Sequence, residues 1–169
     1  MKKMSVSFDS SIPIPDFTLP STEGGRILGS RDFRQHSNLV ILLMHSWSCD
    51  SCRRLVASLH DRREFFSWLD IRVVVIVEEP LIKLAGAEAV LGPEMTLLAD
   101  EDGKVTASFR EGAGNDHPLV VIADRFGAIF EKMELDEGEE IDFGEMESTL
   151  LFIATLCPEC GRPDGESTY

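Results

Sequence analysis

Two continuous apolar runs constrain the fold of this chain more than any other feature. Residues 39–45 read LVILLMH and residues 71–77 read IRVVVIV. Runs of this kind are typical of strands that are buried on both faces, as in a parallel sheet. Between them, apolar residues recur at helical spacing from at or just before Cys52 to Leu69, with charged residues in the intervening positions. The sequence therefore predicts a β–α–β unit and an α/β fold.

The rest of the chain extends this order of strands and helices. The expected elements are a short strand at Phe17–Leu19, a turn at Gly24–Gly25, a short helix capped by Ser30, a helix from Pro80 to Gly92, a strand at 95–100, a short helix at 104–110, a hairpin of 118–123 with 128–133, and a last helix through Met146 and Ile153. This order predicts a parallel sheet covered on both faces, with an antiparallel hairpin at one side. We expect one domain over residues 1–156 and a tail over residues 157–169.

The charge and the longest apolar run exclude several classes of partner. The formal net charge of −14 argues against binding to nucleic acid or to an anionic membrane, because both require basic surfaces. The longest apolar run, Leu39 to Met44, is too short to span a bilayer. A secretory signal requires an apolar segment after its basic residues, and no such segment follows Lys2 and Lys3. We therefore expect a cytoplasmic protein.

Four cysteines form two Cys-x-x-Cys pairs, Cys49 with Cys52 and Cys157 with Cys160. In a reducing compartment such pairs are redox-active or metal-binding rather than structural. A Cys-x-x-Cys pair near a β–α–β unit is a signature of dithiol redox chemistry, and the same spacing also fits half of a zinc site.

The first pair lies where a buried strand passes into a helix. The free N–H groups and the positive end of the helix dipole stabilise a thiolate at Cys49, and Arg53 and Arg54 add positive charge in the first turn. Asp50 acts in the opposite sense and raises the pKa of that thiol. We expect Cys49 to attack a disulfide and the more shielded Cys52 to resolve the mixed disulfide.

Three stretches of the chain resemble the AhpC/TSA–redoxin branch of the thioredoxin-like superfamily. IPDFTLPSTEGGRI resembles the opening hairpin of that branch, and LVILLMHSWSCDSC resembles its strand and Cys-x-x-Cys step. DHPLVVIADRFGAI resembles the segment in which a cis-proline precedes a strand and an Asp-x-x-Gly turn. The likeness covers about residues 12–155. It implies a thioredoxin-like fold, with a central mixed sheet, helices on both faces and an N-terminal β-hairpin extension.

The resemblance also implies roles for three residues outside the cysteine pairs. Pro118 matches the cis-proline that faces the dithiol and shapes the groove for the partner's chain. His117 precedes it and, when protonated, would favour the Cys49 thiolate; the alternative is a solvated loop histidine. Glu79 matches a glutamate near the dithiol of redoxins that reduce cytochrome-maturation partners, where it would accept or relay a proton. The alternative for Glu79 is an ordinary acid at a helix N-terminus.

Departures from the family patterns bear on the reaction. The buried acid that thioredoxins carry before the dithiol falls at Leu43. Peroxiredoxins carry Pro-x-x-x-Thr/Ser-x-x-Cys; Ser46 matches the hydroxyl position, but Leu42 stands at the proline position. The stretch AGNDHP contains no counterpart of the peroxiredoxin arginine, and a peroxide needs hydrogen-bond donors around its leaving oxygen. A thiol peroxidase is therefore the alternative and not the first choice.

The second pair, in the stretch CPECG, resembles the turn of a zinc knuckle. A tetrahedral zinc needs four ligands, and Cys49 and Cys52 would complete an all-cysteine set with Cys157 and Cys160, within one chain or across a dimer. The other use of Cys157 and Cys160 is a redox relay that exchanges with the first pair. Both uses stay open at this point.

These observations together predict an enzyme, a thiol–disulfide oxidoreductase. Its expected partner is a protein disulfide or dithiol, and it requires no cofactor, with zinc at the C-terminal pair as the alternative. A thiol peroxidase and a zinc-binding or partner-binding module of the same fold are the other two hypotheses.

Overall fold

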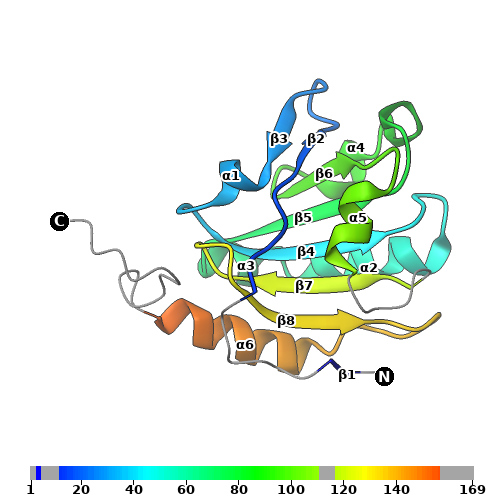
Figure 1. The fold of residues 1–169 in the computed structure, drawn as a ribbon. Helices are drawn as coiled ribbons and strands as arrows, with labels where there is room; N and C mark the ends of the chain where they lie inside the picture. Colours follow the sequence, from blue (N-terminus) through cyan, green and yellow to red (C-terminus); the bar gives the residue numbers. More distant parts are fainter. Residues whose placement is uncertain (1–2, 5–11, 111–116, 157–169) are drawn as a thin grey trace.

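A six-stranded mixed sheet forms the centre of the molecule (Figure 1). This computed structural model describes residues 3–4, 12–110 and 117–156. The strand order is β1-β8-β7-β4-β5-β6. The strands are β1 (Lys3–Met4), β4 (Asn38–Met44), β5 (Ile71–Val77), β6 (Met95–Ala99), β7 (Leu119–Ala123) and β8 (Ile129–Glu134). β4, β5 and β6 run parallel, whereas β7 and β8 form an antiparallel hairpin beside β4, as the sequence predicts.

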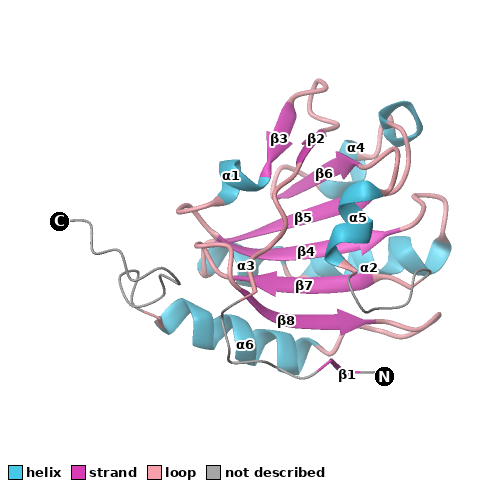
Figure 2. Cartoon of the chain, in the orientation of Figure 1, coloured by secondary structure: helices cyan, strands magenta, loops and turns pink. Residues whose placement is uncertain are grey.

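Helices and a small second sheet cover the two faces of the central sheet (Figure 2). One face carries α2 (Asp50–Asp61), α3 (Arg63–Trp68), the 3-10 helix η1 (Leu81–Leu84), α4 (Glu88–Leu91) and α6 (Phe143–Thr155). The other face carries the antiparallel pair β2 (Thr18–Pro20) and β3 (Ile27–Gly29), with α1 (Ser30–Phe33) and α5 (Lys104–Phe109). The predicted mixed sheet with an N-terminal hairpin is therefore confirmed.

The continuous apolar runs are explained by burial on both sides of the sheet. Successive side chains of a strand point to opposite faces, so Val40 and Leu42 pack under α2 whereas Leu39 and Ile41 pack under the hairpin face. All seven residues of β4 are buried.

Among the described residues, no helix has both the length and the apolar character needed to cross a membrane.

Two expected helices are interrupted. The helix expected up to Leu69 is split into α2 and α3 at Arg62, whose backbone leaves helical geometry and whose side chain lies over the Phe143 ring of α6 at 4.4 Å. The helix expected from Pro80 to Gly92 is split into η1 and α4, because Gly86 between them has a φ of +83°, in the left-handed region that an α-helix excludes.

The short helix α1 also differs from its prediction. It ends at Phe33, and Gly29 rather than Ser30 occupies the N-cap position. The Ser30 hydroxyl instead accepts from the backbone N–H of Phe17 at 3.4 Å and donates to the Asp16 carboxylate at 3.3 Å, so it joins α1 to the segment that leads into β2. The local sequence pattern predicts that the Ser30 hydroxyl caps the helix, but in the structure this hydroxyl makes a tertiary contact instead.

A buried carboxylate stabilises the start of α5. Gly103 is the N-cap residue and has no side chain to cap the helix. Asp100, which is fully buried, takes over this role. Its carboxylate accepts hydrogen bonds from the Thr106 N–H and the Thr106 hydroxyl, each at 2.8 Å, and from the Val105 N–H at 3.4 Å. The end of β6 therefore fixes the position of α5.

Removing this cap is expected to destabilise the protein. Asp100→Ala leaves buried donors of Val105 and Thr106 without their acceptor, and we expect a loss of about 2–4 kcal/mol in the free energy of unfolding. Urea denaturation followed by circular dichroism measures it. Glu101→Ala, which removes an exposed carboxylate from the same turn, is the control and should cost no more than about 0.5 kcal/mol. Equal losses in the two variants would contradict the capping role.

Candidate active site

The register between β4 and β5 brings several polar residues to one edge of the sheet. The two strands are parallel and pair Met44 with Val77, so the segments that follow them leave the sheet side by side. The Glu78 N–H donates to the Met44 carbonyl at 3.1 Å. β7 runs in the opposite direction, with Leu119 opposite Leu43, so the residue that precedes it, Pro118, starts at this same edge.

Cys49 lies at the start of α2 as its N-cap residue. Its sulfur accepts a hydrogen bond from the Cys52 N–H at 3.4 Å and lies 3.2 Å from the Ser51 hydroxyl. Partial burial raises the pKa of the Cys49 thiol, but the hydrogen bonds from Ser51 and Cys52 together outweigh it, so the pKa is lowered. The N-terminal position expected for the attacking thiolate is therefore observed.

Cys52 lies one turn further into α2 and has the opposite environment. Its side chain is fully buried against the core beneath the helix. Burial raises the pKa of the Cys52 thiol to about 12, and the hydrogen bond and the charge of Cys49 act in the same direction. Cys49 and Cys52 are both free thiols in this structure. The two sulfurs thus differ strongly in acidity and in access.

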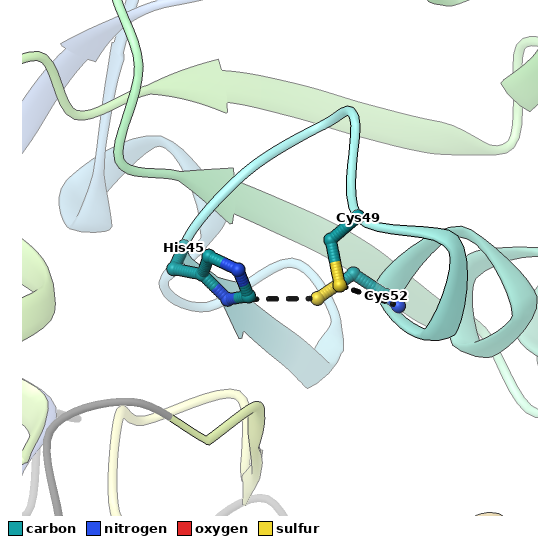
Figure 3. A group of neighbouring side chains, drawn as sticks. All are labelled: His45, Cys49 and Cys52. Carbon is teal, nitrogen blue, oxygen red and sulfur yellow. Dashed lines mark hydrogen bonds between the residues drawn. The ribbon is translucent and has the colours of Figure 1, made fainter. Parts of the chain in front are cut away.

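The histidine beside the dithiol is His45, which directly follows β4. Its Nδ1 lies 3.8 Å from the Cys52 sulfur, and the ligand atoms of His45, Cys49 and Cys52 all lie within 4.8 Å of one another. Figure 3 shows the ring and the two sulfurs turned toward a common point. Sequence reasoning did not select His45. The signal it missed is the spacing His-x-x-x-Cys-x-x-Cys at the end of a buried strand.

Glu79 holds the loop between β4 and α2. One carboxylate oxygen accepts from the Ser46 hydroxyl and the other from the Trp47 N–H, both at 3.0 Å. The Ser48 N–H in turn donates to the Ser46 hydroxyl at 3.2 Å. Glu79 therefore fixes the path of the loop that leads to Cys49. Each of its two oxygens accepts a hydrogen bond from this loop, and neither of these bonds comes from a helix N-terminus.

Pro118 and His117 lie at the same sheet edge, with two differences from expectation. There is no cis peptide bond among the described residues, so the cis geometry expected at Pro118 is wrong. The trans form is the ordinary one for an X-Pro bond, and the resemblance alone had suggested the other. The His117 ring is partly exposed, and its Nε2 lies 4.0 Å from the carboxylate of Asp136, which follows β8.

Comparison with known proteins places this site in a family. The sequence matches the AhpC/TSA family over residues 12–132. The chain belongs to the AhpC/TSA family. Members of this family are redox enzymes, so the chain is a redox protein of the thioredoxin fold. No curated protein sequence is significantly similar to it.

Several solved structures share the fold at low sequence identity. Peroxidoxin BcpB from Mycobacterium tuberculosis superposes with a TM-score of 0.71 at 18% identity, covering 85% of this chain and 96% of that one. A protein assigned as the thiol:disulfide interchange protein DsbE from Chlorobium tepidum gives 0.68 at 20% identity, covering 88% and 99%. Thiol peroxidase from Chromobacterium violaceum gives 0.66 at 22% identity, covering 84% and 86%. These likenesses show the fold.

One further residue near the dithiol escaped the sequence analysis. Arg110, which ends α5, is buried, and its positive charge opposes the rise in the pKa of Cys52. Arg110 precedes the stretch AGNDHP, which has no counterpart of the peroxiredoxin arginine, and its charge acts on Cys52 from the end of α5. Cys157 and Cys160 lie outside the described residues.

The asymmetry of the two thiols predicts selective alkylation. Iodoacetamide reacts with thiolates, so at pH 7–8 we expect it to label Cys49 and to spare Cys52, as mass spectrometry of peptides will show. Ser51→Ala removes a hydrogen bond that lowers the pKa of Cys49, so the pH midpoint of its labelling should rise. Ser58→Ala removes a hydroxyl that donates to the Leu55 carbonyl in α2, and it should not shift this midpoint. Faster labelling of Cys52 would contradict this assignment.

Substitutions of Glu79 separate a structural role from proton transfer. A glutamine can still accept from the Trp47 N–H and donate to Ser46. Glu79→Gln should therefore keep the reaction rate of Cys49 with a small aromatic disulfide within about twofold of the rate in the unaltered protein. Glu79→Ala removes both contacts and should lower the free energy of unfolding by about 1–3 kcal/mol. Stopped-flow kinetics and urea denaturation measure the two effects. A fall of about 10²-fold or more in Glu79→Gln would instead indicate a proton relay.

Proposed function

We propose that this protein is a thiol–disulfide oxidoreductase that uses Cys49 as the attacking thiol and Cys52 as the resolving thiol. The observation that carries the proposal is the asymmetry of the pair: a half-buried thiol of lowered pKa at the helix start and a fully buried thiol of pKa about 12 beneath it. A dithiol that reduces a partner needs one accessible thiolate that attacks the partner's disulfide and a second thiol that later resolves the mixed disulfide.

The first step forms a mixed disulfide. The Cys49 thiolate attacks one sulfur of the partner's disulfide, the S–S bond of the partner breaks, and the second partner sulfur leaves as a thiolate that takes up a proton. The hydrogen bonds from the Cys52 N–H and the Ser51 hydroxyl hold Cys49 as the anion before attack. The Glu79 contacts to the loop keep that sulfur at the helix end.

The second step releases the partner. Cys52 loses its proton and attacks the Cys49 sulfur, and the mixed disulfide between Cys49 and the partner breaks. The partner sulfur that Cys49 had attacked leaves as a thiolate and takes up a proton, while Cys49 and Cys52 form an intramolecular disulfide, so two electrons have passed to the partner. The high pKa of Cys52 makes a nearby base necessary. The ring of His45, 3.8 Å from that sulfur, can accept the proton in the tautomer that leaves Nδ1 unprotonated. We assign this task to His45 and not to Glu79, whose two oxygens accept from Ser46 and Trp47.

Pro118 and His117 contribute to the partner surface in this proposal. Both belong to the sheet edge at which Cys49 lies, and the Pro118 carbonyl is occupied by the Leu135 N–H at 2.9 Å. A partner chain that reaches Cys49 would therefore pass over the ring of Pro118 without using its carbonyl. We propose Cys157 and Cys160 as the pair that passes electrons onward to or from Cys49 and Cys52.

The thiol peroxidase is the second candidate, and one contact argues against it. A peroxidatic cysteine needs donors around the peroxide oxygens. Ser46 has the spacing of the peroxiredoxin hydroxyl, but here its proton is donated to the Glu79 carboxylate. The measure that separates the two functions is consumption of hydrogen peroxide with a thiol donor, compared with reduction of a protein disulfide under the same conditions.

Two cysteine variants test the oxidoreductase. With insulin as the disulfide substrate and dithiothreitol as the donor, Cys49→Ser should abolish catalysed reduction because it removes the nucleophile. Cys52→Ser should accumulate a covalent complex between Cys49 and the substrate, because the resolving thiol is gone, and non-reducing electrophoresis should show it. Cys157→Ser/Cys160→Ser should slow turnover if the tail acts as a relay.

Either of two results would overturn the proposal. Full activity in Cys49→Ser would remove the nucleophile from the mechanism. Peroxide turnover faster than insulin reduction in the unaltered protein would make the peroxidase the better assignment.

A further inference from the structure

Three side chains at the start of α2 form a set of metal ligands that the redox mechanism does not require. His45 offers a ring nitrogen, and Cys49 and Cys52 offer two sulfurs. They come from two adjoining segments, the end of β4 and the first turn of α2, and both segments are fixed by backbone hydrogen bonds and by Glu79. The set is therefore formed by the fold itself, without the C-terminal cysteines.

The distances among these atoms fit a tetrahedral zinc ion. Zn–S bonds of about 2.3 Å and Zn–N bonds of about 2.0–2.1 Å at tetrahedral angles place a sulfur and a nitrogen about 3.6 Å apart, and two sulfurs about 3.8 Å apart. The Cys52 sulfur and His45 Nδ1 lie 3.8 Å apart, and no pair in the set exceeds 4.8 Å. The three ligand atoms therefore already lie close to the spacing that one zinc ion requires.

The surroundings suit a site with one open position. His45 is exposed and Cys49 half-buried, which gives an ion access from solvent, whereas Cys52 is buried and closes the site from below. A set of two thiolates and one imidazole binds zinc in preference to magnesium or calcium, which favour oxygen ligands. With three protein ligands, the fourth position is left to water or to another ligand, as in catalytic rather than structural zinc sites.

We propose that the reduced protein binds one Zn²⁺ through His45, Cys49 and Cys52. Binding releases the thiol protons that remain on Cys49 and Cys52, forms two Zn–S bonds and one Zn–N bond, and transfers no electrons. Because both sulfurs are then held by the ion, the zinc form cannot attack a disulfide. Zinc would thus hold the same dithiol in an inactive, oxidation-protected state. The binding itself does not depend on the proposed oxidoreductase activity.

The test uses the full chain, reduced and kept anaerobic. The variant Cys157→Ser/Cys160→Ser removes the other two thiols, and we expect it still to bind one zinc per chain in native mass spectrometry. In this background His45→Ala should weaken zinc binding at least about tenfold, as measured by competition with a chromophoric zinc chelator, since loss of a ligand should cost no less than loss of an outer contact. His36→Ala is the control, because His36 is exposed and precedes β4 whereas His45 follows it, so the two histidines lie at opposite ends of that strand, and it should not change the affinity.

A second substitution protects the test from misfolding. His45→Cys replaces one zinc ligand by another and should retain zinc, so loss of zinc in His45→Ala alone would be a ligand effect. Equal affinity in His45→Ala and His36→Ala would overturn the proposal, and so would a zinc ion that the Cys157→Ser/Cys160→Ser variant no longer binds. Because zinc binding is measured without any disulfide substrate, failure of the oxidoreductase proposal would leave this result readable by itself.

Discussion

The parallel pairing of β4 with β5 is the constraint on which the rest of the site depends. Seven residue pairs lock the two strands in one register, from Asn38 with Ile71 to Met44 with Val77. A shift by one residue would turn every buried side chain to the opposite face, so this register is strongly fixed by the two cores. It follows that the loop after Met44 and the loop after Val77 must leave the sheet together, and Glu79 can then reach the segment that carries Cys49.

The chemistry of the dithiol arises from position rather than from unusual residues. Cys49 and Cys52 are the same residue type, three positions apart, yet one lies at the open end of a helix and the other under its first turn. Backbone N–H groups without helical partners stabilise negative charge on the first sulfur, whereas the core excludes charge from the second. His45 and Arg110 then approach the buried sulfur from different elements, which makes its deprotonation feasible at all.

Local patterns predicted the parts of this structure that local physics decides. The strands at 39–45 and 71–77 were recognised because burial on both faces demands apolar residues throughout. The sequence did not predict the split at Gly86 in the helix expected from Pro80 to Gly92. A single glycine among helically spaced apolar residues is compatible with a continuous helix as well as with an interruption. The choice of His45 over His117 was missed for another reason: both flank strands at the same edge, and only the path of the loop held by Glu79 decides which ring meets the sulfurs.

The N-cap hydrogen bond from Cys52 to Cys49 links the start of α2 to the reduction potential of the site. A thiolate is a strong acceptor for the free N–H groups of a helix, whereas a disulfide sulfur is a weak one. Every contact that favours the thiolate is therefore weakened when the disulfide forms, and the reduced state is favoured by that difference. For a two-electron couple, about 1.4 kcal/mol of such stabilisation raises the potential by about 30 mV. The first turn of this helix therefore sets how readily the protein gives up its electrons.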